Sequence, residues 1–167
     1  AFRVLLINIS SYFTSDRNIS EYDVLEPPLG LIALLSYTNH VFKDQVTGKI
    51  IKSRVDFDSY EELNNKIKEF NPDIIGVSTM TFHKDFFHKS IQKIRENGYK
   101  KTIFVGGPHP TTSYEEVIQD PNIDFVSIGE GEATVVEVAE KLIKNKKKKL
   151  NKENLSKIKG IVFDPKN

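Results

Sequence analysis

The chain contains no cysteine and no tryptophan among its 167 residues. The lack of cysteine excludes disulfides, thiolate metal sites and any iron–sulfur cluster held by this segment alone. No apolar run reaches the roughly 18 residues that a membrane-spanning helix needs, and the first residues do not have the charged-then-apolar pattern of a signal peptide. The formal net charge is only +1, so no global charge favours a nucleic-acid partner. We expect a cytoplasmic protein without a membrane span.

Short apolar segments of strand length alternate along the chain with segments of helical periodicity. Strands are predicted at residues 3–10, 49–57, 73–79, 102–105 and 124–128, with a possible extra strand at 161–163. Helices are predicted from Pro27 and Pro28 to about Val41 and at 60–70, 85–96, 113–119 and 132–144. Such alternation implies right-handed βαβ crossovers and a parallel sheet covered on both faces. We therefore predict a flavodoxin-like (Rossmann-like), doubly wound α/β fold with five parallel strands and a possible extra edge strand at the C-terminus.

The lysine-rich stretch from Asn145 to Lys159 divides the chain into residues 1–144 and a tail, 145–167. A phosphate-binding patch is one interpretation of this stretch. A solvated loop is favoured, because asparagine and glutamate rather than aromatic residues interrupt the lysines.

The candidate site residues follow the predicted strands. In an open parallel sheet, ligands bind outside the carboxyl ends of the strands, near the point where the strand order reverses. Small and hydroxyl side chains at this edge let a large ligand approach the backbone and satisfy its polar groups. The residues in these positions are Asn8, Ser10, Ser78, Thr79, Met80, Gly106, Gly107, Pro108, His109, Gly129, Glu130, Gly131 and Glu132.

Several of these residues have two interpretations each. The Gly106-Gly107 pair is either a turn that needs a positive φ or a point of ligand contact. His109 is either a hydrogen-bonding residue or a metal ligand, and the two prolines around it fix the backbone. Glu130 and Glu132 are placed either to complement a helix dipole or to bind ligand amides and hydroxyls.

Two further features are less specific. His83 and His88 are five residues apart, which does not place them on one helical face, and we expect both at the surface. The first helix has apolar residues on more than one stripe. Either the helix as a whole packs tightly on the sheet, or its outer face is covered by a large ligand or another domain. We favour the second interpretation.

Four segments together resemble the N-terminal cobalamin-binding domain of cobalamin-dependent radical S-adenosylmethionine enzymes. They are PPLGLIALLSY (27–37), DIIGVSTMT (73–81), IFVGGPHPT (103–111) and DPNIDFVSIGEGEAT (120–134), and KGIVFDP (159–165) resembles the segment that leads into the radical domain. The resemblance implies a cobalamin on the carboxyl edge of the sheet, with its nucleotide tail in a groove against the first, third and fourth strands. It also assigns Pro28, Leu29 and Gly30 to the cofactor site.

Two departures from related patterns refine this expectation. The Asp-x-His-x-x-Gly motif of methionine-synthase-like domains is missing, so the resemblance implies base-off binding without that histidine. His109 stays a possible cobalt ligand. The Cys-x-x-x-Cys-x-x-Cys motif of the radical family is also missing, so S-adenosylmethionine and a [4Fe-4S] cluster are expected only in a radical domain beyond this segment.

The sequence therefore predicts a cobalamin-binding module with no catalytic residue of its own. In the full protein, the implied reaction is methyl transfer, radical rearrangement or cyclisation. One alternative is a sensor or interaction domain that has lost the corrin. Receiver function is disfavoured, since Asn8 and Ser10 stand where a receiver needs an acidic cluster. Flavin binding is disfavoured because the proline and glycine pattern of the other loops fits cobalamin better.

Overall fold

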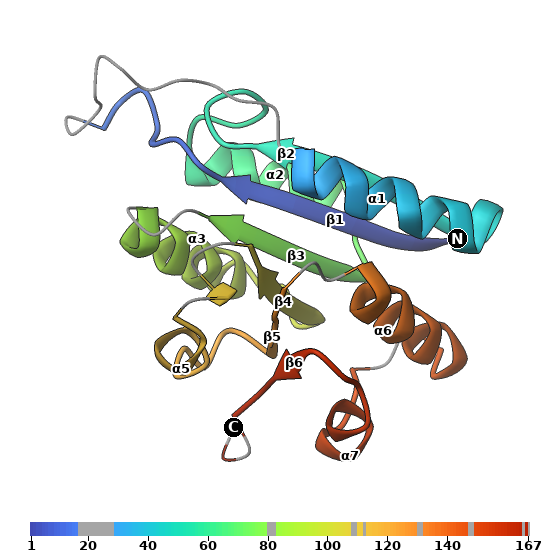
Figure 1. Ribbon diagram of the computed structural model, residues 1–167. Helices are drawn as coiled ribbons and strands as arrows, with labels where there is room; N and C mark the ends of the chain where they lie inside the picture. The colour runs from blue at the N-terminus through green and yellow to red at the C-terminus, as the bar shows by residue number, and fades with distance from the viewer. Residues whose placement is uncertain are drawn as a thin grey trace.

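A six-stranded sheet forms the centre of the molecule, with the strand order β2-β1-β3-β4-β5-β6 (Figure 1). The computed structural model describes residues 1–16, 29–79, 83–107, 110–111, 113–129, 132–146, 149–164 and 166. The strands are β1 (Phe2–Ile9), β2 (Val46–Lys52), β3 (Ile74–Thr79), β4 (Thr102–Gly106), β5 (Phe125–Ser127) and β6 (Ile161–Val162). The first five pair in parallel and β6 pairs antiparallel to β5. The predicted fold class and the extra edge strand are confirmed.

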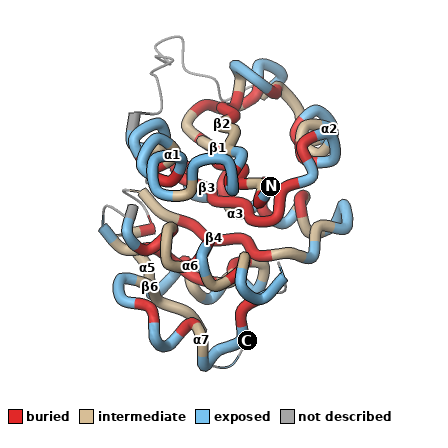
Figure 2. Tube along the Cα trace, turned by 90° about the vertical axis from the view of Figure 1, so that its right-hand side faces the viewer, coloured by how far each residue is buried: buried red, intermediate tan, exposed pale blue. Residues whose placement is uncertain are grey.

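Helices lie on both faces of the sheet. They are α1 (Leu29–Phe42), α2 (Tyr60–Phe70), α3 (Lys84–Glu96), α5 (Tyr114–Val117), α6 (Glu132–Lys144) and α7 (Lys152–Ser156), with a short 3-10 helix, η1, at Lys43–Gln45. One core cluster joins the sheet to α2 and α3, and a second joins it to α1, α6 and α7. Figure 2 shows buried residues along the strands and exposed residues on the outward sides of α1 and α2. No helix in the described ranges is long and apolar enough to cross a membrane.

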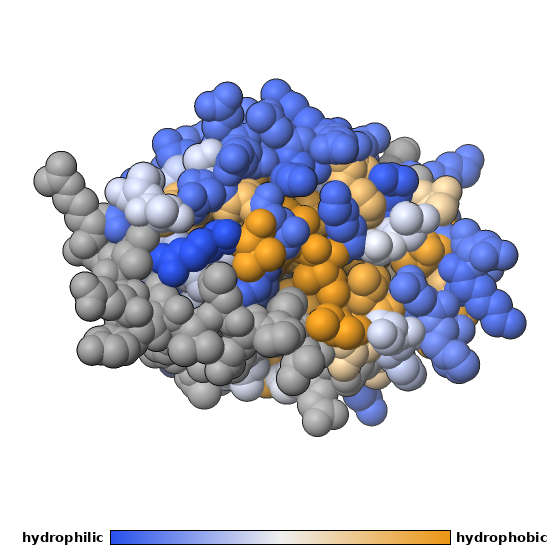
Figure 3. Space-filling view, turned by 90° about the horizontal axis from the view of Figure 1, so that it is seen from above, coloured by the Kyte–Doolittle hydropathy of each residue, from blue (hydrophilic) through white to orange (hydrophobic). Residues whose placement is uncertain are grey.

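Helix α1 is only partly buried, although it is rich in apolar residues. Leu34 and Thr38 face the sheet and are buried, whereas Ile32, Tyr37 and Val41 are each more than 40% exposed, at 43%, 44% and 43%. Figure 3 shows the apolar surface that gathers over this helix. Packing on the sheet therefore holds for one side of the helix. The other side is not covered by described residues, so its cover by a ligand or another domain stays a prediction.

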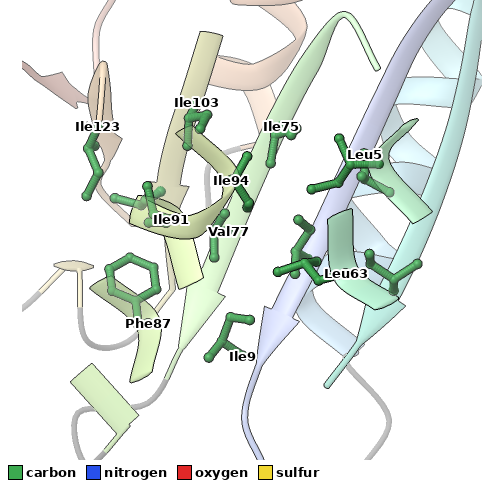
Figure 4. Close-up of a cluster of buried hydrophobic side chains, with 14 of the residues drawn as sticks. Leu5, Ile9, Leu63, Ile75, Val77, Phe87, Ile91, Ile94, Ile103 and Ile123 are labelled. Carbon is green, nitrogen blue, oxygen red and sulfur yellow. The ribbon is translucent and has the colours of Figure 1, made fainter. Parts of the chain in front are cut away.

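The core between the sheet and α2 and α3 consists of branched aliphatic and aromatic side chains (Figure 4). All six residues of β3 are buried, as expected of a central parallel strand covered on both faces. Helix α2 begins after Ser59, whose Oγ accepts a hydrogen bond from the Glu62 backbone N–H at 3.1 Å. It ends at Asn71 in the left-handed region, with φ 51°. The predicted bounds of this helix, 60–70, are confirmed.

Two glycines allow close packing on the face that α1 and α6 cover. A Cβ at Gly48 would lie 1.9 Å from Leu35 Cδ1, and a Cβ at Gly76 would lie 2.5 Å from Phe104 Cζ. Phe104 itself stacks on Phe125 with ring centroids 5.4 Å apart. At both strand positions, neighbouring side chains occupy the space that a Cβ would take.

The amino edge of the sheet is held together by paired polar groups. Arg95 on α3 donates to the backbone oxygens of Asn122, Tyr99 and Lys101 at 3.1, 3.0 and 2.7 Å. Its Nη2 also lies 3.0 Å from Asp124 Oδ2. This arrangement ties α3 to the segments that lead into β4 and β5, so these charges serve the fold.

The prediction for strand 49–57 is wrong at both ends. The strand begins at Val46, and after Lys52 the chain turns. Arg54 has φ 69° and its backbone N–H donates to the Phe57 oxygen at 2.8 Å. The strand lies at the edge of the sheet, next to β1.

The prediction that 145–159 is a solvated loop is wrong for its second half. Helix α7 begins after Asn151, whose Oδ1 accepts from the Asn154 N–H at 2.9 Å. Leu150, Leu155 and Ile158 are buried in the core cluster with α6. These three apolar residues are sufficient to anchor the segment to the core, although the lysine-rich composition does not indicate it.

Candidate functional site

Four residues form a row across the carboxyl end of the sheet. The register pairs Asn8 with Lys52 on one side and with Ser78 on the other, and pairs Ser78 with Gly106. We call Lys52, Asn8, Ser78 and Gly106 the edge row. Side chains alternate between the faces of a strand, and residues two positions earlier, among them Leu6 and Phe104, belong to the cluster with α1 and α6. The edge row therefore lies on the face of α1 and α6.

Hydrogen bonds connect the side chains of the edge row. Lys52 Nζ donates to Asn8 Oδ1 at 3.3 Å, and Asn8 Nδ2 donates to Ser78 Oγ at 3.4 Å. Lys52 Nζ also donates to Ser10 Oγ. Lys52 and Ser78 are only 7% and 9% exposed. The lysine thus fixes the amide orientation of Asn8, with its oxygen toward β2 and its nitrogen toward β3.

Sequence reasoning missed Lys52. The predicted strand continued to residue 57, which placed this lysine in the middle of a strand instead of at its end. The signal that identifies it is its register with Asn8, which a single sequence does not contain.

The two predicted hydroxyl residues at the end of β3 face opposite sides of the sheet. Ser78 belongs to the edge row. Thr79 is 3% exposed on the face of α2 and α3, and its Oγ1 donates to the Ile9 backbone oxygen at 2.6 Å. Thr79 therefore ties the end of β3 to the end of β1, the two strands at which the strand order reverses.

The two glycines after β4 differ in their backbone conformation. Gly107 has φ +100°, a conformation that favours glycine, and a Cβ there would lie 3.2 Å from Ser78 Cβ. Gly106 has no positive φ, and the nearest contact of a Cβ there would be an ordinary one, 3.6 Å from the Ser127 backbone oxygen. The turn interpretation applies to Gly107, whereas the backbone conformation gives no reason for a glycine at 106.

The loops after β4 and β5 are joined to each other. The Thr111 N–H donates to the Gly107 oxygen at 3.0 Å, and the Gly129 N–H donates to Thr111 Oγ1 at 3.4 Å. Gly129 has φ +80°. These contacts bring two predicted site residues, Gly107 and Gly129, to one side of the carboxyl edge.

Some of the remaining predicted site residues are not among the residues that the structure describes. Pro28, Met80, Pro108, His109, Glu130 and Gly131 lie outside the described residues, so the interpretations of His109 and Glu130 remain predictions. Leu29 and Glu132 are the first residues of α1 and α6. Gly30, in the first turn of α1, is exposed, and no atom would lie within 4 Å of a Cβ there.

The prediction that His83 lies at the surface is wrong. Its side chain is 2% exposed and its ring centroid is 5.0 Å from that of Tyr12. His88 is partly exposed, with Nδ1 2.7 Å from Asp120 Oδ2. Burial alone would raise the pKa of the Asp120 carboxyl, but hydrogen bonds from His88 and the Asn122 backbone outweigh burial and hold this pKa below its usual range. No group of three His, Cys, Asp or Glu residues in the described part of the chain could hold a metal ion.

This fold and this row of residues define a class of protein. It is a doubly wound α/β domain in which the strand order reverses between β1 and β3, and sheets of this kind bind ligands at the carboxyl ends of the strands near that point. Residues 20–139 match the family described as B12 binding domain. The chain belongs to this family, and the resemblance drawn from the sequence is confirmed.

Curated relatives are longer than this chain. An uncharacterized methyltransferase of Pyrococcus horikoshii is 34% identical over 126 residues, which cover 74% of this chain and 26% of the relative. The anaerobic magnesium-protoporphyrin IX monomethyl ester cyclase of Cereibacter sphaeroides is 27% identical over 135 residues, covering 80% and 20%. The chain thus spans about a quarter or less of the length of these relatives.

Solved structures share the fold. The cobalamin-dependent S-adenosylmethionine radical enzyme OxsB, with aqua-cobalamin and S-adenosylmethionine bound, matches 98% of this chain with a TM-score of 0.74 and 24% identity. The radical S-adenosylmethionine methyltransferase TsrM from Kitasatospora setae matches 98% with a TM-score of 0.70 and 15% identity. The match covers 21% of the OxsB chain and 28% of the TsrM chain.

Proposed function

We propose that this chain is the cobalamin-binding domain of a radical S-adenosylmethionine enzyme. It holds cobalamin in the base-off form, with the corrin over the carboxyl edge of the sheet and the nucleotide tail along the edge row. The observation that carries this proposal is the edge row itself, which places neutral polar and small residues, with one lysine, at the switch point of a B12-binding fold.

The residues of the edge row fit a nucleotide tail. Ser78 and Gly106 are small, so a flat aromatic base can approach the backbone of β3 and β4 there. Asn8, Ser10 and Lys52 supply hydrogen-bonding groups for the polar parts of the tail. Thr79 faces the other side and acts by holding β1 and β3 together at this edge.

The share of this chain in the reaction is to bind and orient the corrin. When bound, cobalamin supplies a cobalt centre for methyl transfer or for radical rearrangement or cyclisation. A radical domain of the same full-length chain would hold S-adenosylmethionine and a [4Fe-4S] cluster, with three closely spaced cysteines. Support comes from the relatives, which include a methyltransferase and a cyclase and are several times longer. The exposed apolar side of α1 is available to pack against such a domain. A cytoplasmic location and the lack of a nucleic-acid partner stay predictions.

Base-off binding predicts a specific paramagnetic-resonance spectrum. The complete protein, loaded with cobalamin and reduced to the cob(II)alamin form, should show no nitrogen splitting from a lower axial ligand, because the benzimidazole is held away from the cobalt. Electron paramagnetic resonance measures this directly, with free base-on cob(II)alamin as the control.

Two results would change the proposal. Nitrogen splitting that disappears in a His109→Ala variant would make His109 the axial ligand and contradict binding without histidine. A protein that retains no cobalamin after gel filtration would instead favour a sensor or interaction domain that has lost the corrin.

A further inference from the structure

A buried serine hydroxyl lies beside the β4 end of the edge row. The register pairs Val105 with Val126, so the next residues along the two strands, Gly106 and Ser127, lie side by side. A Cβ at Gly106 would be 3.8 Å from the Cβ of Ser127. Phe125, two positions before Ser127, belongs to the cluster with α1 and α6. Ser127 therefore extends the edge row onto β5, on the same face of the sheet.

The hydroxyl of Ser127 has no hydrogen-bond partner among the described residues. The residue is only 3% exposed, and its Oγ is shielded from solvent. A buried polar group without a partner destabilises the folded protein, because its hydrogen bonds to water are lost and not replaced. Such groups are rare in folded proteins. The position of this one, next to a candidate ligand site, indicates that a ligand satisfies it.

No side chain of β4 separates this hydroxyl from a ligand on the row. Gly106 is partly exposed and has no side chain, and adjacent strands are only about 4.8 Å apart. A flat base that lies over Ser78 and Gly106 would therefore turn one edge toward β5 and the Ser127 hydroxyl. A serine hydroxyl donates to a ring nitrogen and accepts from an amino group, whereas a methyl group leaves it without a partner.

We propose that Ser127 selects the lower base of the corrinoid, and that the site prefers a purine base to dimethylbenzimidazole. This inference rests on the proposed function and names the class of corrinoid that the same site takes. The six-membered ring of dimethylbenzimidazole presents only carbon atoms and methyl groups, whereas that of adenine presents ring nitrogens and an amino group. The purine thus supplies a partner for the buried hydroxyl, at a place shielded from water where a hydrogen bond is strong.

Three corrinoids with the same corrin ring test the inference. Cobalamin carries dimethylbenzimidazole, adeninylcobamide carries adenine on the same tail, and cobinamide has no lower base. The complete protein is titrated with each, and the dissociation constants are measured by absorption for wild type and Ser127→Ala. The decisive quantity is the change that the variant causes in the ratio of the cobalamin and adeninylcobamide constants. The two bases also differ in their affinity for cobalt, but this difference is the same for both proteins.

We expect the wild type to bind adeninylcobamide about tenfold more tightly than cobalamin, as one additional hydrogen bond gives. In Ser127→Ala this preference should fall by about tenfold. The variant should bind cobinamide within about twofold of wild type, because cobinamide has no base to contact residue 127. Unchanged cobinamide binding also shows that the variant is folded.

Unfolding by urea gives a second measurement that does not depend on the ligand. Ser127→Ala should leave the midpoint unchanged or raise it, because the variant removes a buried hydroxyl that has no described partner. Ser90→Ala is the matched control. Ser90 is also buried, but its Oγ donates to the Phe86 backbone oxygen at 2.7 Å, so the midpoint should fall in this variant.

Three outcomes would overturn the inference alone. The first is a wild type that binds cobalamin at least as tightly as adeninylcobamide, and the second is a ratio that Ser127→Ala leaves unchanged. The third is a loss of stability in Ser127→Ala as large as that in Ser90→Ala, which would show that the hydroxyl is already satisfied within the protein. A wild-type protein that binds none of the corrinoids would instead overturn the proposed function, and the inference with it.

Discussion

Gly106→Leu should reduce cobalamin binding by more than about a hundredfold while the protein stays folded. The position has an ordinary strand conformation with room for a Cβ, so the free energy of unfolding should change by less than about 1 kcal/mol. The leucine side chain would extend over the edge row next to Ser78, where the proposal places the base of the nucleotide tail. Cobalamin retention after gel filtration and the midpoint of urea unfolding measure the two effects.

Gly107 supplies the contrast to this variant. Its φ of +100° makes any side chain strained there, so Gly107→Ala should lower the free energy of unfolding by about 1–2 kcal/mol. Loss of binding at 107 would thus be confounded with loss of fold, which makes position 106 the sharper test. A folded Gly106→Leu variant that retains cobalamin would contradict the placement of the tail along the edge row.

Arg95→Met should lower the free energy of unfolding by about 3 kcal/mol or more. The side chains of Arg95 and Asp124 are each 16% exposed. The variant leaves three backbone oxygens without the guanidinium, and Asp124 keeps only Lys149, 2.6 Å away, as an ion-pair partner. Denaturant unfolding measures the loss. Because this network lies at the amino edge of the sheet, the folded variant should still bind one cobalamin per chain.

Lys93→Met is the control on the same helix. Its ammonium lies 3.5 Å from Glu96, but its side chain is 40% exposed, and exposed ion pairs contribute less than about 1 kcal/mol. If Arg95→Met lowers the free energy of unfolding as little as Lys93→Met does, this result would contradict the role of Arg95 in joining α3 to the segments that lead into β4 and β5.

The fold could be predicted because the sequence alternates clearly between buried strands and amphipathic helices. The bounds of α2 and α6 were predicted as observed. The errors in the predicted elements lie in two polar segments, whose composition does not indicate how they pack. The predicted bounds of the polar strand β2 extended into the turn that follows it. In the lysine-rich segment, the helix α7 was not predicted, although Leu155 anchors it in the core.

The site could be predicted only in outline, as small and polar residues at the ends of strands. That Ser78 and Thr79 face opposite sides follows from the two-residue period of a strand, so the sequence contained this information. The place of Lys52 depends on the register between β1 and β2, and the difference between Gly106 and Gly107 depends on φ. Both are properties of the folded backbone that a single sequence does not reveal.

The most direct test of the central claim is a crystal structure of the complete protein with bound cobalamin. The measurement is the distance from the benzimidazole ring to Ser78 and Gly106. We predict contact at about 4 Å on the face of α1 and α6, with the corrin over the carboxyl edge of the sheet. A benzimidazole coordinated to the cobalt, or a tail on the face of α2 and α3, would contradict the account.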